Sequence, residues 1–445
     1  MTRRSGSRRT AGGQRGHGGR SSGRPARPRP ARAVALDALD RIDEGGAYAN
    51  LVLPGVLDRS GLAPADRRFV TDLVYGTTRM RRACDHLVDG YVDRPLDARV
   101  RNALRLGAYQ LAFAGVPPHA AVGETVGVAP RPARGLVNAV LRRVAAAPAA
   151  VAWPDDATRL SVPDWVLDEL IASLGGEVAR AALATMNEPA TVSARDDGYV
   201  QDPASQQVAA VVGARPGERV LDLCAAPGGK ATALAAAGAT VVAADVRHRR
   251  TALLARNARH VTPGAAGAAS AGSVTGGPVP GGRSSVGSVT GARAAGTAPG
   301  VEGRVVAVTA DGARPPWREG AFDRVLVDAP CSGLGTLRRR PDLRWRIETD
   351  AVGRLAGLQR RLLAAAAGLV RPGGTLVYSV CTLTAAETTG VDEWLATTRP
   401  DLVPTAPPAE PWRRWGRGAM LLPQAAGTDG MCLFRYVRRA TDDHG

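Results

Sequence analysis

The residues Val220-Leu221-Asp222-Leu223-Cys224-Ala225-Ala226-Pro227-Gly228-Gly229-Lys230 decide how the chain is expected to fold. The stretch begins with a short apolar run, which is typical of a buried strand, and ends in a Pro-Gly-Gly turn. The Ala- and Leu-rich run 231–237 then favours a helix. A strand, a glycine-rich turn and a helix bring backbone N–H groups close to a ligand. The glycine spacing matches neither GxGxxG nor GxxxxGK[ST], which argues against a dinucleotide site or a P-loop.

Two neighbouring features strengthen the prediction of a ligand site at this turn. The run 240–245 is typical of a second strand, and it ends in Asp245, about 20 residues after the glycines, where an acid suits a pair of ribose hydroxyls. Lys230 is the only lysine in a chain with 58 lysines and arginines. A single lysine at this position indicates that the site needs a compact ammonium group rather than a guanidinium. The alternative is that the one lysine stands here by chance.

Composition limits the class of protein. A chain of 445 residues is long enough for two or three domains with their own cores. No apolar run is long enough to span a membrane, and the N-terminal arginines are not followed by the apolar segment of a signal peptide. The five cysteines are odd in number and lack CxxC spacing, which argues against a disulfide framework or metal site and favours a reducing cytoplasm. The net charge of +17 indicates a polyanionic partner such as nucleic acid.

The first part of the chain divides into a basic tail and a helical domain. Residues 1–32 contain ten arginines and no acid, so we expect a disordered tail that can bind RNA phosphates without reading sequence; a solvated tail with no role is the alternative. Residues 33–147 show apolar stripes at helical spacing, with arginines on other faces, which predicts an all-α domain. The clearest helical runs are 33–42, 69–79, 100–111 and 135–143.

The rest of the chain is predicted to form an α/β domain with a doubly wound, mostly parallel sheet. Residues 148–200 are a connector, and 201–438 alternate strands with helices. Residues 263–303, rich in Gly, Ala, Ser and Pro with one short repeat, are expected to be a disordered insertion in a surface loop, and 439–445 a short tail. The later strands are expected at 304–309, 323–328 and 374–380, with a closing pair at 420–422 and 431–437 that includes an antiparallel edge.

Two of the five cysteines follow expected strands. Cys331 comes three residues after Asp328, which ends one strand, and Cys381 directly follows the next. Ligands bind at the carboxyl ends of parallel strands, and consecutive strands tend to be neighbours, so we expect both thiols to face one cleft and to be catalytic. A free cysteine is more often a small buried apolar residue. Three cysteines are assigned that structural role: Cys84, Cys224 and Cys432.

Three motifs give the chain a resemblance to one family. Residues 220–230, 328–333 (Asp-Ala-Pro-Cys-Ser-Gly) and 378–383 (Tyr-Ser-Val-Cys-Thr-Leu) are similar to the motifs of RsmB/Sun-type RNA (cytosine-5)-methyltransferases, which use S-adenosylmethionine and act on 16S ribosomal RNA. Residues 33–147 resemble the NusB-like RNA-binding domain that precedes their catalytic domain. The resemblance implies a multidomain protein, with an all-α NusB-like N-terminal domain followed by an α/β Rossmann-like methyltransferase domain.

The resemblance also implies a role for each motif residue. Asp245 would hold the ribose hydroxyls of S-adenosylmethionine, Asp311 would lie near its adenine, and Asp328 near its methionine end and the target base. Cys381 resembles the nucleophile that adds to carbon 6 of cytosine, and Cys331 the residue that releases the product. The residues that would wrap the cofactor are Cys224, Ala225, Ala226, Pro227, Gly228, Gly229 and Lys230. The implied partner is RNA, most simply 16S rRNA, and we expect a cytoplasmic monomer with no metal and no membrane contact.

The chain departs from the family pattern in three places. Val380 and Thr382 flank Cys381 where the family usually has Thr and Ser, and the insertion 263–303 is foreign to the pattern. Only residues 190–200 separate an Asn-Glu-Pro from a Gln-Asp-Pro where the family has a longer segment. A small RNA-contacting subdomain is therefore predicted to be cut down.

Other functions stay open at this point. A cytosine-5 methyltransferase acting on tRNA or 23S rRNA would have the same motifs. A non-catalytic NusB-like RNA-binding protein would explain the helical domain but not the cofactor motif. A nicotinamide dehydrogenase would use the same sheet without explaining the two cysteines, and a DNA cytosine methyltransferase would need neither the second cysteine nor the helical domain.

Overall fold

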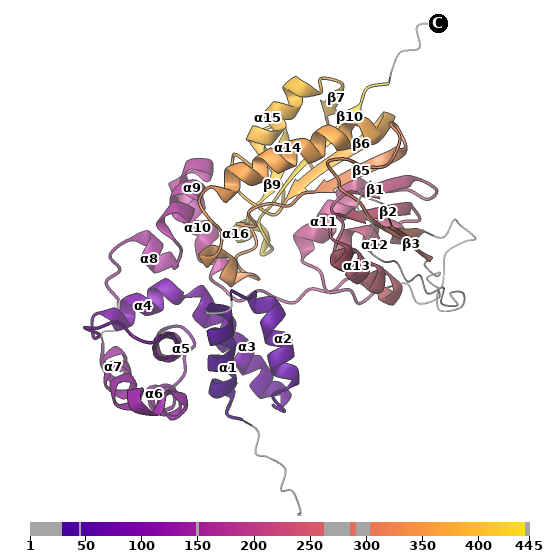
Figure 1. Cartoon of the computed structure of the whole chain (residues 1–445). Helices are drawn as coiled ribbons and strands as arrows, with labels where there is room; N and C mark the ends of the chain where they lie inside the picture. Colours follow the sequence, from indigo (N-terminus) through magenta and orange to yellow (C-terminus); the bar gives the residue numbers. More distant parts are fainter. Residues whose placement is uncertain (1–28, 44–45, 148–150, 262–284, 291–302, 441–445) are drawn as a thin grey trace, which may run out of the picture.

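A computed structural model describes residues 29–43, 46–147, 151–261, 285–290 and 303–440 (Figure 1). The predictions of a disordered tail and of a disordered insertion fall largely on residues outside these ranges, as does most of the predicted tail 439–445. The described residues form a helical N-terminal domain and a larger α/β domain. None of the helices in these ranges is long and apolar enough to cross a membrane.

The N-terminal domain contains only helices in its described residues, as predicted, and they enclose one apolar core. Small residues allow two of the helix crossings. A Cβ on Gly76 would lie 1.9 Å from the ring of Tyr109, and one on Gly107 would lie 2.3 Å from Leu141, so these helices touch only because both positions are glycine. The helices are α1 (Ala31–Asp43), α2 (Ala49–Asp58), α3 (Pro64–Arg79), α4 (Arg81–Asp89), α5 (Ala98–Ala112), α6 (Pro118–Val128), η1 (Arg131–Ala133) and α7 (Arg134–Ala146).

The α/β domain is built on one ten-stranded sheet with the order β3-β4-β2-β1-β5-β6-β10-β9-β8, with β7 paired to β10. The strands β4, β2, β1, β5 and β6 are parallel, and β10 joins β6 antiparallel, as the apolar run near the C-terminus predicted. The strands are β1 (Arg219–Asp222), β2 (Thr240–Asp245), β3 (Ser285–Thr290), β4 (Arg304–Thr309), β5 (Phe322–Asp328), β6 (Val370–Val380), β7 (Leu402–Pro404), β8 (Arg413–Trp415), β9 (Gly418–Leu421) and β10 (Met431–Arg438).

Helices cover both faces of this sheet, so its central strands are apolar on both sides (Figure 1). Val220 and Leu326 point into the core under α11, α12 and α13, whereas Leu221 and Val325 point into the core under α14. Because side chains alternate between the two faces of a strand, neighbouring residues of one strand lie in different cores. The covering helices are α11 (Pro203–Val212), α12 (Gly229–Ala236), α13 (His248–Val261), η3 (Pro341–Trp345), α14 (Ala351–Leu369), α15 (Thr389–Thr398) and α16 (Pro423–Ala426).

The connector packs on the α/β domain rather than standing apart. It forms α8 (Asp156–Leu160), α9 (Asp164–Leu174) and α10 (Gly176–Met186), whose apolar residues share the core of α14. That the short segment 190–200 is the remainder of a reduced RNA-contacting subdomain stays a prediction.

The structure differs from the prediction inside the insertion 263–303. Six of its residues form β3, which pairs antiparallel with β4 over its whole length. Without β3, β4 would be a sheet edge with unpaired backbone N–H and C=O groups. The run Ser-Val-Gly-Ser-Val-Thr supplies β-branched residues for such a strand.

A buried contact joins the two domains. The indole Nε1 of Trp345, at the end of η3, donates to the carbonyl of Thr78 on α3 (2.7 Å). The guanidinium of its neighbour Arg344 is buried and donates to the carbonyls of Arg79 (3.3 Å) and Ser161 (3.0 Å) and to Oδ1 of Asn187 (2.8 Å). Burial lowers the pKa of Arg344 to about 9. Arg344 therefore joins the N-terminal domain, the connector and the catalytic domain at one point.

Candidate active site

The glycine-rich turn lies at the carboxyl end of β1, as the sequence predicted. It is held to neighbouring strands by backbone hydrogen bonds, from Leu223 to Leu326 (2.9 Å) and from Ala225 to Ala244 (2.8 Å). Gly228 has φ of 109°, a conformation that glycine adopts at little cost, and the chain then enters α12. The turn thus presents its backbone at the edge where β1, β2 and β5 end.

Lys230 joins a partly buried ion pair. Its Nζ lies 2.7 Å from Oδ2 of Asp328, and Oδ1 of Asp328 accepts from the hydroxyl of Ser379 (2.6 Å). Burial alone would lower the pKa of Lys230, but Asp328 and, more weakly, Asp222 raise it above its ordinary value. The lysine stays charged and fixes the Asp328 carboxylate beside the turn.

The two cysteines expected to share a cleft lie side by side. The sulfur atoms of Cys331 and Cys381 are 3.3 Å apart, and both residues are partly exposed. They meet because β5 and β6 are parallel neighbours with Asp328 opposite Ser379. The hydrogen bond with Cys381, followed by burial, raises the pKa of Cys331 well above its ordinary value. The Cys331 thiol therefore keeps its proton, which it can donate to the sulfur of Cys381.

A buried glutamate that the sequence did not reveal holds both cysteine loops. Oε1 of Glu387 accepts from the backbone N–H of Ser332 (2.8 Å) and from Nε2 of Gln359 (3.0 Å), and Oε2 accepts from the hydroxyl of Thr384 (3.0 Å). Gln359 also donates to the carbonyl of Pro330 (2.9 Å). The only signal in the sequence is an acid in an otherwise uncharged run of small residues after Cys381.

The two acids expected near the ribose and the adenine end neighbouring strands. Asp245 is 3% exposed; its Oδ1 accepts from the backbone N–H of Arg247 (3.0 Å), and its Oδ2 lies 3.3 Å from Nη1 of Arg250. Asp311 is exposed, and its Oδ1 accepts from the N–H of Ala313 (2.9 Å). Both lie at the carboxyl edge of the sheet, Asp245 two strands and Asp311 three strands from β5, which precedes Cys331.

Asp222 is a second residue that sequence reasoning missed. It ends β1, is 1% exposed, and its pKa is raised to about 8 by burial and by the negative charge of Asp328. The signal was present, since an acid in a buried strand just before a ligand turn is costly without a purpose. With Asp245 and Asp328, it makes a set of acidic side chains that fits a ribose-bearing, positively charged cofactor at the turn, since ionised carboxylates accept hydrogen bonds from ribose hydroxyls.

The other three cysteines show no sign of chemistry. Cys84 and Cys432 are fully buried, and the thiol of Cys432 donates to the carbonyl of Thr382 (3.3 Å). Cys224, in the turn, is partly exposed, and burial raises its pKa. Among the described residues no cluster of His, Cys, Asp and Glu could hold a metal ion.

Comparison with known proteins agrees with this arrangement. The family model of 16S rRNA methyltransferase RsmB/F matches residues 209–265 and 298–436, and the NusB family model matches residues 29–146. The solved structure described as "Crystal Structure of PH0851" has a TM-score of 0.67 at 19% identity and covers 92% of this chain and 99% of its own, which shows a shared fold. The fold and site thus define a Rossmann-like S-adenosylmethionine methyltransferase joined to a NusB domain.

Full-length relatives narrow the class to a family. The chain is 36% identical over 440 residues to ribosomal RNA small subunit methyltransferase B of Thermus thermophilus, covering 92% of this chain and 96% of that protein. It is 29% identical over 481 residues to the protein of the same name from Pseudomonas syringae, covering 93% and 98%. The chain belongs to the RsmB/F family of 16S rRNA methyltransferases.

Proposed function

We propose that this protein transfers a methyl group from S-adenosylmethionine to carbon 5 of a cytosine in 16S rRNA. The observation that carries the proposal is the pair of sulfur atoms 3.3 Å apart, next to the Asp328 carboxylate that Lys230 holds. A dehydrogenase or a passive RNA-binding protein has no use for two adjacent thiols. A DNA cytosine methyltransferase needs only one of them.

The cofactor would lie along the turn 224–230. We assign the ribose hydroxyls to Asp245, the adenine end to Asp311 and the methionine end to Asp328. Acidic side chains at the ends of β1, β2 and β5 support this assignment, because S-adenosylmethionine is a cation with a free ribose; Asp222 and Asp245 are buried and Asp328 is partly exposed. When bound, the cofactor supplies a methyl group on a sulfonium ion.

Cys381 is proposed as the nucleophile. Its thiolate adds to carbon 6 of cytosine and the double bond between carbons 5 and 6 breaks. The electron pair of that double bond makes carbon 5 nucleophilic enough to take the methyl group. The proton of Cys331 stabilises the thiolate before attack, since the hydrogen bond joins the two sulfur atoms. Asp328 is fixed by Lys230 and Ser379, and we assign it to the nitrogen-3 side of the ring.

Cys331 is proposed to complete the reaction as the base. Once the sulfur of Cys381 is bound to carbon, it no longer accepts the hydrogen bond that contributes most to the raised pKa of Cys331. Cys331 then loses its proton to solvent and takes the proton from carbon 5. The bond between carbon 6 and Cys381 breaks, the double bond between carbons 5 and 6 re-forms, and the thiolate returns. One proton is released per methyl group transferred.

The RNA substrate must present its target cytosine unpaired or flipped out, because carbons 5 and 6 must reach two sulfur atoms at once. The NusB domain and the net charge of +17 support RNA as the partner. The monomeric state stays a prediction.

Bisulfite sequencing of total RNA tests this proposal. RNA from a strain that lacks the gene should show one cytosine in 16S rRNA that is no longer protected, and the wild-type gene should restore the protection. If protection were lost only at a cytosine in tRNA or 23S rRNA, that RNA would be the substrate instead of 16S rRNA. No lost signal in any RNA would overturn the proposed function.

A further inference from the structure

A cleft of about 570 Å³ lies between α3 of the N-terminal domain and the catalytic domain, apart from the cofactor turn. Its α3 side includes Arg68, Tyr75 and Arg79, and its opposite side includes Val192, Arg338 and Arg339. Resting on the function proposed above, we propose that this cleft binds a nucleotide of the substrate RNA that flanks the target cytosine. Its volume is in the range of sites that enclose a small ligand, about 300–1,000 Å³.

The walls of the cleft suit the face of a base. The ring of Tyr75 is partly buried beside them, and Val192 and Val200 are 84% and 65% exposed. Both valines belong to the short segment 190–200, which turns back on itself through a bridge between Ala194 and Val200. Exposed apolar side chains on the wall opposite an aromatic ring form a cleft in which an unpaired base can stack.

Four arginines and two aspartates line the cleft, so its net charge is positive. Both aspartates have other partners: Asp72 accepts from the hydroxyl of Tyr109 (3.1 Å), and Asp202 accepts from the N–H of Ala204 (2.9 Å). Arg68 is exposed and forms no ion pair with the residues that the structure describes. A phosphate between the two walls would supply the missing counter-charge.

Arg79 is the second sign of a missing anion. It is 4% exposed, its Nη2 donates to the carbonyl of Arg338 (3.1 Å), and its Nε has no hydrogen-bond partner in the described part of the chain. No described carboxylate lies within 4.0 Å of it; burial lowers the pKa of Arg79, and Asp72 at a longer distance only partly offsets this. A buried cation without a carboxylate is costly, and an RNA phosphate in the cleft would lower that cost.

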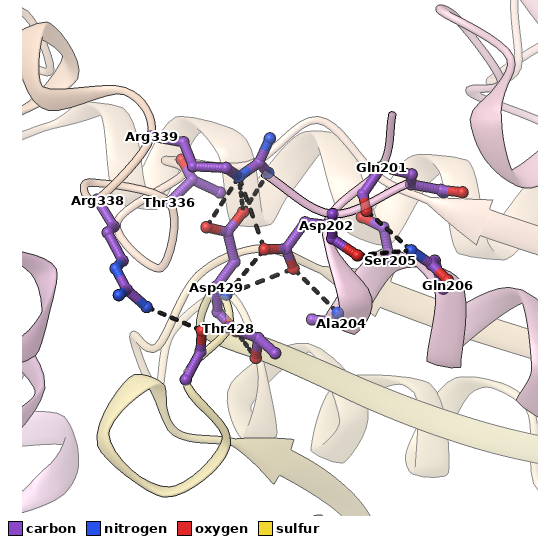
Figure 2. A network of polar contacts seen from close by, with 12 residues as sticks. Gln201, Asp202, Ala204, Ser205, Gln206, Thr336, Arg338, Arg339, Thr428 and Asp429 are labelled. Carbon is purple, nitrogen blue, oxygen red and sulfur yellow. Dashed lines mark hydrogen bonds and ion pairs between the residues drawn. The ribbon is translucent and has the colours of Figure 1, made fainter. Parts of the chain in front are cut away.

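The cleft is continuous with the catalytic loop. Arg339 is fixed by an ion pair with Asp429 and lies 3.8 Å from Asp202 (Figure 2). Its N–H donates to the carbonyl of Thr336 (3.0 Å), and the preceding Gly335 donates to the carbonyl of Cys381 (3.0 Å). A nucleotide in the cleft would therefore lie next to the base held at the two cysteines.

Two substitutions in the full-length protein test the cleft. Tyr75→Leu removes the ring and keeps an apolar side chain, while Arg68→Ala changes only an exposed residue. Each should raise the KM for RNA, about 10-fold for Tyr75→Leu, and leave kcat and the Kd of S-adenosylmethionine unchanged. The matched control is Arg361→Ala, which removes an exposed arginine on α14 that contacts only its own helix.

Abasic substitution identifies the occupant. Short single-stranded fragments of 16S rRNA, each with one abasic nucleotide, are titrated against wild type and Tyr75→Leu. One abasic position beside the target cytosine should weaken binding to wild type about 10-fold and have no further effect on Tyr75→Leu. Equal losses in both proteins, or a KM for Tyr75→Leu that equals the control, would overturn the cleft proposal.

The same titration separates this inference from the proposed function. If overlapping fragments bind and Tyr75→Leu weakens their binding while no cytosine becomes methylated, the proposed function fails and the cleft stands as an RNA site. If methylation proceeds and no abasic position distinguishes the two proteins, the cleft proposal fails alone.

Discussion

The cysteine loops and the interdomain cleft contrast in how far their polar groups are satisfied. Around the cysteines, Glu387, Lys230 and Asp328 all have hydrogen-bond partners within 3.0 Å. The two thiols form a hydrogen bond with each other. In the cleft, two valines are exposed, and the buried guanidinium of Arg79 forms no ion pair within the part of the chain that the structure describes. The contrast indicates that the reacting groups are fixed in advance, whereas the cleft proposed to bind RNA would be completed only by its ligand.

The largest expected effect concerns the two thiols. Cys381→Ala should lower the rate of methylation by about 10⁴-fold or more, because no adduct at carbon 6 can form. Cys331→Ala should still attack and methylate but should stall before release. A denaturing gel with labelled RNA should show a slow protein–RNA band for Cys331→Ala and none for Cys381→Ala or the double variant.

The opposite gel pattern would exchange the two roles. Full activity in both single variants would contradict a preformed catalytic pair and return both cysteines to a structural role. Cys432→Ala, which changes a buried thiol on β10, is the control and should show no band.

A smaller effect is expected at Glu387. Glu387→Ala leaves the N–H of Ser332 and the donors of Gln359 and Thr384 without their buried acceptor. We expect a loss of about 3 kcal/mol in the free energy of unfolding. Chemical denaturation measures it against Glu393→Ala, an exposed residue of α15 that should change stability by less than about 0.5 kcal/mol.

Asp245→Ala should weaken S-adenosylmethionine by about 10- to 100-fold, the equivalent of one lost charge-assisted contact. Calorimetry measures the Kd, with Asp350→Ala, an exposed aspartate before α14, as the control. An unchanged Kd for S-adenosylmethionine would show that Asp245 does not contact the cofactor. RNA affinity should not change, since Asp245 lies away from the cleft.

Asp222 should make the stability of the free protein depend on pH. Its pKa rises from 3.8 to about 8 on folding, so between these values the folded state keeps a proton that the unfolded chain releases. Stability therefore falls as pH rises through this window. Asp222→Asn cannot ionise, so between pH 5 and pH 8 it should lose less stability than the wild type, by about 3 kcal/mol. Parallel pH curves for the two proteins would contradict the shift.

The smallest effect is expected from the N-terminal segment. Deleting residues 2–28 removes eight arginines and should flatten the salt dependence of RNA binding, by about 0.7 in slope for each lost phosphate contact. The abasic positions that weaken binding should stay the same, because these contacts read no sequence. Identical salt slopes would show that the segment does not touch RNA.

What the sequence could predict depended on how local the signal was. The sheet, the turn 224–230 and the meeting of Cys331 with Cys381 follow from short motifs at strand ends, since parallel neighbours bring such ends together. The roles of Asp245 and Asp311 stay predictions. The strand β3 was missed because its Gly- and Ser-containing run becomes a strand only beside the open edge of β4.

The cleft and the Glu387 network could not be predicted from the sequence. Tyr75 and Arg339 are more than 260 positions apart and meet only because η3 docks on α3. Glu387 matters through Gln359 and Ser332, from two other segments. Neither set has a spacing that local periodicity would reveal.

The docking of η3 also has a consequence for unfolding. The guanidinium of Arg344 is buried with its Nε and Nη2 unpaired, and the carbonyls of Arg79 and Ser161 are among its acceptors. Pulling the helical domain away would remove an acceptor from a charge that has no carboxylate to replace it. Heat should therefore melt both domains in a single cooperative transition, and a fragment lacking residues 1–147 would expose Trp345 and lose solubility before it lost its sheet.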